Sequence, residues 1–371
     1  MTKIQSHCSR TLREAGTMRK FRLDVIQFSQ RRSVFLTHFF VICLTLVAFM
    51  VPGFTFAEDF KAWVYTKLPD TPEGIGVDPK GNLYAALFHT GEVVRLEDDG
   101  TYTHIAWVPS KAESGKGMLI GLDTDKNSNI YVAYKAHSKY DSMVDPHHPA
   151  CKDTKDTTSG VYKIDAATHR VIAVATRGDG WPFCLPDDVD IDDAGNIYVT
   201  DVTYAGIWKI TPDGQAIMWS DHPLLNWSPT PYSGYPWGVN VLVLDKEQKN
   251  IYAATDGDPM VLRIPILEDG SAGEPVVISR GHSPFDGIEL DEEGNIYLSE
   301  IFRNEIMVLS PDGNRRRIIA TKDNAPLDNN TSLVLRDGVL YTANLGIGHK
   351  KWQDADKTIV AIKGFPKPKR K

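Results

Sequence analysis

The stretch that decides the fold reads Asp291-Glu-Glu-Gly-Asn-Ile-Tyr297. It is a short polar turn, and Gly294 stands where a bulged hairpin needs a left-handed backbone. The flanking segments Gly287–Asp291 and Ile296–Ser299 are apolar and short, as strands are. Two further strands are predicted after them, at Glu305–Leu309 and Arg317–Ala320. One unit of the chain therefore predicts four antiparallel strands without a helical segment between them.

The same turn recurs along the chain. Its close copies are Asp78-Pro-Lys-Gly-Asn-Leu-Tyr84 and Asp192-Asp-Ala-Gly-Asn-Ile-Tyr198. Looser copies run from Asp123 to Tyr131 and from Asp245 to Tyr252, and a shortened one ends at Tyr341. Six four-stranded units repeated in this way are typical of an all-β fold, the six-bladed β-propeller.

The last unit contains only three predicted strands, Ser332–Leu335, Val339–Asn344 and Thr358–Lys363. The segment Ala62–Thr66 precedes the first unit and belongs to none of them. We expect it to supply the missing outer strand of the last blade and so to close the ring, because closure covers an otherwise exposed sheet edge.

The first 57 residues form a separate region. Arg31-Arg32 precede an apolar run from Val34 to Val51, and small residues stand at Thr55 and Ala57. This pattern predicts a signal peptide over 1–57 that is cleaved after Ala57, and hence export to the periplasm or the extracellular space. An uncleaved anchor is the alternative, because the run is long enough to span a bilayer. It would be the protein's one link to a membrane. The propeller is predicted over 58–366, followed by a basic tail, 367–371.

Charge narrows the choice of partners. The chain has a net charge of −7, and residues 1–57 hold eight Lys or Arg against two acidic residues, so residues 58–371 carry −13. An acidic surface is a poor match for nucleic acid. We expect a monomer that acts on a small molecule.

Two cysteines remain after the predicted cleavage, Cys151 and Cys184. An even pair in an exported protein favours a disulfide. The alternatives are two buried thiols or a zinc site that includes His147, His148 and Cys151, whose spacing fits no standard zinc motif.

Polar residues occupy one repeated position near the start of the predicted inner strands. The position five residues before the Asp that ends each inner strand holds Glu73, Met118, Asp187, Asn240, Asp286 and, with a one-residue gap, Thr331. Oxygen side chains that converge from several blades need a cation to relieve their repulsion. Oxygen ligands suit Ca²⁺ first, with Mg²⁺, Mn²⁺ and Zn²⁺ as alternatives. The alternative to a cation site is that these side chains bond to backbone N–H groups at the starts of the inner strands.

Four short motifs carry a resemblance to a known family. They are Pro72-Glu-Gly74, Pro186-Asp-Asp188, Val239-Asn-Val241 and Phe285-Asp-Gly287. Through them, residues 69–345 resemble the regucalcin, gluconolactonase and luciferin-regenerating enzyme family of six-bladed propellers. The resemblance implies that Glu73, Asn240 and Asp286 hold a metal ion. Asp187 stands where the family has an Asn that contacts metal-bound water or substrate.

The resulting hypothesis is a metal-dependent lactonase that cleaves a lactone or a related ester. Asp286 or Asp187 would take the proton of the attacking water. Substrate contacts are predicted for Asp187, Thr331, Met118, Trp237 and His89. Trp237 ends an aromatic insertion, 219–237, that either covers the site or packs on its own blade.

Two other classes of propeller stay open. One is a non-catalytic binding propeller of the NHL or YWTD type, which needs no converging carboxylates. The other is a strictosidine-synthase-like propeller, which resembles this family and uses a catalytic Glu without a metal. The sequence contains no Gly-x-Ser-x-Gly nucleophile motif of the α/β-hydrolases.

Overall fold

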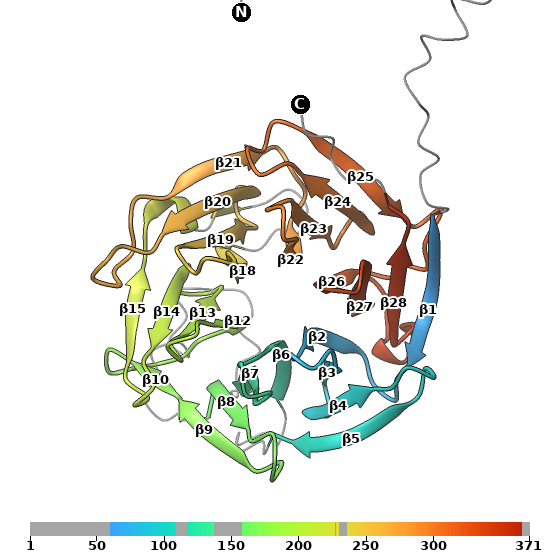
Figure 1. Cartoon of the computed structure of the whole chain (residues 1–371), viewed down its shortest axis with the longest axis horizontal. Helices are drawn as coiled ribbons and strands as arrows, with labels where there is room; N and C mark the ends of the chain where they lie inside the picture. Colours follow the sequence, from blue (N-terminus) through green and yellow to red (C-terminus); the bar gives the residue numbers. More distant parts are fainter. Residues whose placement is uncertain (1–59, 109–116, 137–157, 227, 230–235, 366–371) are drawn as a thin grey trace, which may run out of the picture. The chain divides into compact units, whose positions relative to one another are not determined.

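A computed structural model describes residues 60–108, 117–136, 158–226, 228–229 and 236–365. The predicted signal peptide, the basic tail and Cys151 lie outside these residues, so the signal and the disulfide stay predictions. The described part is a six-bladed β-propeller, as the sequence predicts, and in each blade the strands follow one another outward from the central axis (Figure 1).

The first three blades use strands in chain order. Blade 1 contains β2 (Pro72–Val77), β3 (Leu83–Leu87), β4 (Glu92–Leu96) and β5 (Tyr102–Trp107). Blade 2 contains β6 (Gly117–Thr124), β7 (Ile130–Ala136), β8 (Gly160–Ile164) and β9 (Val171–Ala175). Blade 3 contains β12 (Pro186–Ile191), β13 (Ile197–Asp201), β14 (Gly206–Ile210) and β15 (Ala216–Ser220).

The remaining blades follow the same plan except at the ring closure. Blade 4 contains β18 (Val239–Leu244), β19 (Asn250–Thr255), β20 (Met260–Pro265) and β21 (Val276–Arg280). Blade 5 contains β22 (Phe285–Leu290), β23 (Ile296–Glu300), β24 (Glu305–Leu309) and β25 (Arg316–Thr321). Blade 6 contains β26 (Asn330–Arg336), β27 (Val339–Asn344), β28 (Thr358–Lys363) and β1 (Lys61–Lys67).

A few short elements lie between the blades. They are the hairpins β10 (Arg177–Gly178) with β11 (Trp181–Pro182) and β16 (Ser228–Pro229) with β17 (Pro236–Trp237), and the 3₁₀ turns η2 (Pro223–Leu225) and η3 (Trp352–Asp354). Among the described residues, no helix has the length and apolar character needed to cross a membrane.

Strand β1 closes the ring as predicted. It pairs antiparallel with β28, from Lys61 opposite Lys363 to Lys67 opposite Thr358. The Tyr65 ring packs edge-on against Tyr341 at 5.1 Å between ring centroids. Its hydroxyl donates to the Glu97 carbonyl of blade 1 at 3.0 Å. The N-terminal strand thus completes blade 6 and ties it to blade 1.

The hydrophobic core lies between the blades. Six clusters of buried apolar side chains each combine residues of two neighbouring blades. In one of them Leu298 of blade 5 packs with Ala254 and Val261 of blade 4. Because every sheet is covered on both faces by its neighbours, the strands are apolar along much of their length.

The repeated turn is held by its own side chains. In blade 5, one Asp291 oxygen accepts from the Asn295 backbone N–H at 2.9 Å and the other accepts from the Asn295 amide at 2.8 Å. The Tyr297 hydroxyl donates to the same carboxylate at 3.2 Å. The Asp–Asn pairs that make the same two bonds are Asp78–Asn82, Asp125–Asn129, Asp192–Asn196 and Asp245–Asn250. This explains why Asp, Asn and Tyr recur together.

The turn of blade 2 corrects one predicted register. Its anchoring residue is Asp125, not Asp123, which is the last residue but one of β6. The residue five positions before Asp125 is Ile120, so Ile120 rather than Met118 is the counterpart of Glu73. The sequence comparison placed the repeat two residues early because both positions hold Asp.

We expect Asp291→Ala to destabilise the propeller by about 1–3 kcal/mol, since it leaves the buried Asn295 and its neighbours without their acceptor. Urea unfolding measures this loss. The control is Glu292→Ala, which removes an exposed acidic side chain from the same turn and should change stability by less than about 0.5 kcal/mol. Equal effects of the two variants would contradict the role of the Asp–Asn pair.

Candidate metal centre

The residues of the candidate site lie at bulges near the starts of the innermost strands of their blades. Each inner strand shows a register shift against its neighbour near its first residues. The shift lies between Pro72 and Ile75 in β2 and between Phe285 and Gly287 in β22. A bulge interrupts the pairing and re-aims side chains. Glu73 and Asp286 occupy these bulges, which explains how they turn toward the axis.

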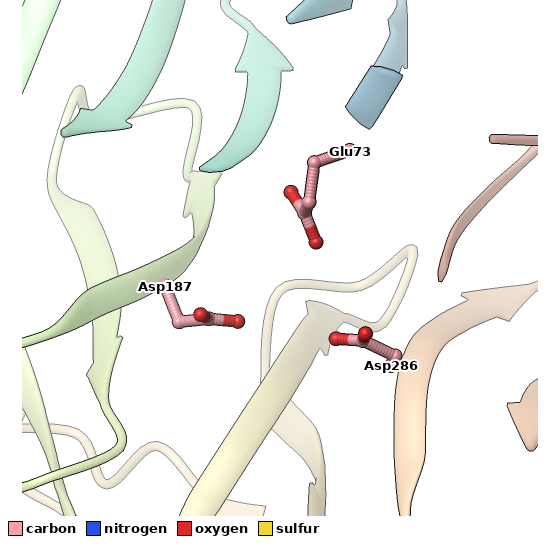
Figure 2. A group of neighbouring side chains, drawn as sticks. All are labelled: Glu73, Asp187 and Asp286. Carbon is pink, nitrogen blue, oxygen red and sulfur yellow. The ribbon is translucent and has the colours of Figure 1, made fainter. Parts of the chain in front are cut away.

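Three carboxylates converge at the centre of the ring. Glu73 from blade 1, Asp187 from blade 3 and Asp286 from blade 5 each place an oxygen within 4.8 Å of the others, and Figure 2 shows the side chains pointing toward one another. Glu73 is buried, with 3% of its surface exposed. Asp187 and Asp286 are half-buried. The predicted convergence of these blades is confirmed.

Asn240 of blade 4 completes the set. Its amide nitrogen donates to the Phe285 carbonyl at 2.9 Å, to Asp256 at 3.0 Å and to Asp286 at 3.1 Å. A carbonyl only accepts, so this contact fixes which end of the amide is nitrogen. The other end, Oδ1, is buried without a hydrogen-bond partner, as is Oε2 of Glu73. Two oxygens therefore lack the donor or cation that burial demands.

The same carboxyl groups repel one another electrostatically, and their pKa values show it. Burial, followed by the charges of Asp286 and Asp187, raises the pKa of Glu73 well above its ordinary value. Burial and Asp286 do the same to the pKa of Asp187. Burial raises the pKa of Asp286 to about 7, against the opposing hydrogen bond from Asn240. A divalent cation bound among these groups would compensate the charges that raise the pKa values.

The donor set fits a hard divalent cation. Glu73, Asp187 and Asp286 offer carboxylate oxygens, and Asn240 offers an amide oxygen with no other partner. These are the oxygen ligands that Ca²⁺ prefers, and a Ca²⁺ shell of six to eight oxygens would leave places for water or substrate.

Asp256 was missed by the sequence analysis. It follows β19 of blade 4, accepts from the Phe285 backbone N–H at 2.8 Å and from the Asn240 amide, and so orients Asn240. The positions that follow the second strand in blades 1, 3, 5 and 6 hold Phe88, Val202, Ile301 and Leu345. An acidic residue in blade 4, at a position that is apolar in these four blades, is the sequence signal that could have identified Asp256.

The converging side chains form the floor of a cavity of about 260 Å³. Three residues with predicted substrate contacts, Met118, Trp237 and His89, line it. His89 is held by Asp70, with 3.0 Å between Nδ1 and the carboxylate oxygen. They lie where a bound molecule could reach them, and their contacts with a substrate stay predictions.

Thr331 differs from the prediction. It is fully buried, does not line the cavity, and donates its hydroxyl to the Glu73 carbonyl at 2.7 Å. Blade 6 lies beside blade 1, so the short Thr331 side chain meets the neighbouring inner strand before it can reach the cavity. Its role is to hold the backbone of Glu73.

The aromatic insertion divides between the two expected roles. Trp219 belongs to β15 and packs on Tyr198 of its own blade at 5.3 Å between ring centroids. Trp237 lines the cavity and stacks with Phe302 at 6.2 Å. Trp227, Tyr232 and Tyr235 lie outside the described residues.

A Gly follows the metal-site residue in the Phe285-Asp-Gly287 motif for a steric reason. A Cβ atom at Gly287 would lie 2.4 Å from the Thr331 carbonyl oxygen, which belongs to the next inner strand. Only a residue without a side chain lets blades 5 and 6 approach this closely. The glycine therefore sets the depth at which Asp286 enters the site.

Ser279, His282 and Glu300 are arranged in the order of a Ser–His–Glu catalytic triad. Ser279 Oγ lies 2.8 Å from Nε2 of His282, whose Nδ1 lies 3.4 Å from Glu300. The His282 and Glu300 side chains are completely buried, and none of the three residues lines the central cavity. A nucleophile needs access to substrate, so we assign this arrangement to packing.

Fold and site together define the class, a six-bladed propeller with an acidic site on its axis. The family model for strictosidine synthase-like proteins, N-terminal, matches residues 67–96, which cover most of blade 1. None of the curated proteins compared matches the chain.

Solved structures of other proteins share the fold. The gluconolactonase XC5397 from Xanthomonas campestris aligns with a TM-score of 0.58 and 14% identity over 84% of this chain and 91% of its own. A candidate gluconolactonase aligns at 0.55 and 14%, over 82% and 92%. The PQQ-bound aldose sugar dehydrogenase from Streptomyces coelicolor aligns at 0.54 and 13%, over 82% and 98%. These likenesses show a shared fold, while the neighbours' differing activities leave function to the site.

We expect the cation-free protein to lose stability as the pH rises from about 4 to about 8. The folded state keeps a proton on Asp286 up to about pH 7, whereas the unfolded chain releases it near its ordinary pKa of 3.8. The folded state therefore binds more protons in this interval, and stability falls with pH. Thermal unfolding in a chelator at about pH 5 and about pH 8 measures the difference.

Adding Ca²⁺ should raise the unfolding temperature mainly at the higher pH, because cation and protons compete for the same oxygens. Asp286→Asn should shrink this calcium-dependent gain. A gain that is the same at both pH values would contradict a cation site among these carboxylates.

Proposed function

We propose that the protein is a divalent-cation-dependent hydrolase that opens lactones or cleaves related esters. The observation that carries this proposal is the convergence of Glu73, Asp187 and Asp286 within 4.8 Å at the floor of a cavity, beside the unpartnered oxygen of Asn240. Ca²⁺ is the cation that this oxygen set suits best. The fold shared with a gluconolactonase agrees with this chemistry.

The roles of the residues follow from their contacts. When bound, the cation would polarise the substrate carbonyl and stabilise the oxyanion that develops on it. Glu73, Asn240 and Asp286 would hold it. The hydrogen bond from Asn240 fixes Asp286 in place at 3.1 Å. Asp187 accordingly suits the role of base: it takes a proton from water as the water oxygen attacks the carbonyl carbon. The same proton then passes to the ring oxygen as its bond to carbon breaks.

A metal-free mechanism of the strictosidine-synthase-like type is the second candidate. The family-model match over residues 67–96 favours it, and Glu73 is the carboxylate of that stretch that lines the cavity. The unpartnered Asn240 oxygen favours the metal, since a lone catalytic Glu would not need it. A binding propeller of the NHL or YWTD type needs neither feature.

We also propose that the protein acts after export, in the periplasm or outside the cell. The proposal rests on the basic, apolar and small-residue pattern of residues 1–57. Cell fractionation tests it: recovery of the protein outside the cytoplasm supports export, and recovery in the cytoplasm alone contradicts it. N-terminal sequencing of the exported protein then tests cleavage, since a chain that begins at Glu58 supports cleavage and an intact leader contradicts it.

Elemental analysis and lactone turnover test the metal and the reaction together. The native protein should retain a divalent cation, most of all Ca²⁺, and a chelator should abolish turnover. Glu73→Gln and Asn240→Leu should lose the cation and lower kcat/KM by about 10²-fold or more, as loss of oxyanion stabilisation does.

The matched control is Asp123→Asn. Asp123 is a half-buried carboxyl that lines a second cavity and not the central one. This variant should keep both the cation and the activity. Turnover that survives the chelator and Asn240→Leu but not Glu73→Gln would instead favour the metal-free mechanism.

A further inference from the structure

Nearly every blade contributes apolar side chains to the wall of the cavity. Phe88, Val202, Ile301 and Leu345 follow the second strands of blades 1, 3, 5 and 6, and Met118 and Ile120 come from blade 2. These side chains belong to one contiguous buried cluster. Because several separate chain segments contribute, the apolar character belongs to the described lining as a whole rather than to one blade.

The described lining residues offer few polar partners to a substrate. The floor holds carboxylates and Asn240, whose amide hydrogens already go to Asp256, Phe285 and Asp286. Above the floor, apart from the indole N–H of Trp237, one polar side chain lines the part of the wall that the structure describes. It is His89, whose Nδ1 faces Asp70. A sugar lactone would bury several hydroxyl groups here, and each one left unpaired costs about 1–3 kcal/mol.

Charge excludes a further group of substrates. Four carboxyl groups line the cavity and together carry four negative charges when ionised, so a divalent cation leaves two uncompensated. They belong to Glu73, Asp187, Asp256 and Asp286. An anionic substrate would meet this charge inside an apolar wall, where electrostatic repulsion is weakly screened. The cavity therefore suits a neutral molecule.

We infer that the substrates are neutral, apolar lactones or esters, such as alkyl-substituted δ-lactones, rather than polyhydroxylated sugar lactones. This inference rests on the proposed function. The ester carbonyl lies at the acidic floor, and the hydrocarbon part lies against Phe88, Ile301 and Leu345. The cavity of about 260 Å³ limits the substrate to a small ring with a short chain.

A homologous series of lactones tests the inference with the holoenzyme. Comparing δ-valerolactone, δ-hexalactone and δ-octalactone with glucono-δ-lactone keeps the ring ester constant. We expect kcat/KM to rise about fourfold for each added methylene until the cavity is full, and glucono-δ-lactone to be the poorest of the four. A preference for glucono-δ-lactone would overturn the inference while leaving the proposed function in place.

Substitutions at Ile347 and Leu267 test whether the gain in kcat/KM per methylene arises from the wall of the cavity. Ile347 is a half-buried wall residue, and Ile347→Asn should weaken the gain per methylene, whereas Ile347→Val should keep most of it. Leu267→Asn makes the same kind of change at a side chain that is 47% exposed outside the cavity, and it should leave the series unchanged. An unchanged slope in Ile347→Asn would overturn the inference.

Binding of lactams separates the substrate class from the reaction. Calorimetry should show tighter binding of a propyl-substituted δ-valerolactam than of gluconolactam to the cation-loaded protein. If no lactone is hydrolysed, the proposed function fails, and this measurement alone decides the inference. Tighter alkyl-lactam binding supports the apolar class, and equal, reversed or absent binding overturns it.

Discussion

Repulsion between carboxylates that ring closure brings together is the constraint on which the site depends. Glu73, Asp187 and Asp286 come from separate blades, and no single blade brings them close. The cores between blades and the pairing of β1 with β28 hold them within 4.8 Å of one another. The energy stored in this repulsion becomes affinity for whatever compensates the charge, whether a proton or a cation. A stable scaffold is therefore the condition for a reactive centre.

The same residue type behaves in opposite ways at the two ends of the inner strands. Burial alone would raise the pKa of Asp78, but hydrogen bonds from Asn82 and from backbone N–H groups bring it below the ordinary value. At the floor of the cavity, burial and neighbouring charges raise the pKa of Glu73 and Asp187 instead. Asp at the turns is satisfied and structural, whereas Asp at the axis lacks such compensation and is available for chemistry.

The sequence was sufficient to predict those parts of the structure in which the recurring residues contact one another within a single turn. Asp291, Asn295 and Tyr297 bond to one another within a single turn, so their pattern survives in five blades and predicts the fold. Glu73 and Asp286 could be predicted because they keep a fixed distance from that turn. Asp256 and Thr331 could not be assigned their roles, since both bond to a neighbouring blade. Asp256 accepts from the Phe285 backbone N–H of blade 5, and Thr331 donates to the Glu73 carbonyl of blade 1. In blade 2, Met118 was assigned the position that Ile120 holds, because Asp123 and Asp125 both lie near the turn.

The ring closure also fixes when the protein can finish folding. Strand β1 is the first strand of the propeller to be synthesised, yet its partner β28 is the last strand in the sequence. Blades 1 to 5 contain only strands that are neighbours in sequence, so each can form from local contacts. Blade 6 must wait until the whole chain is present, and the axial cavity is complete only after that last pairing. The ring stays open until β1 meets β28, so completion of the site depends on a contact between strands from the two ends of the propeller.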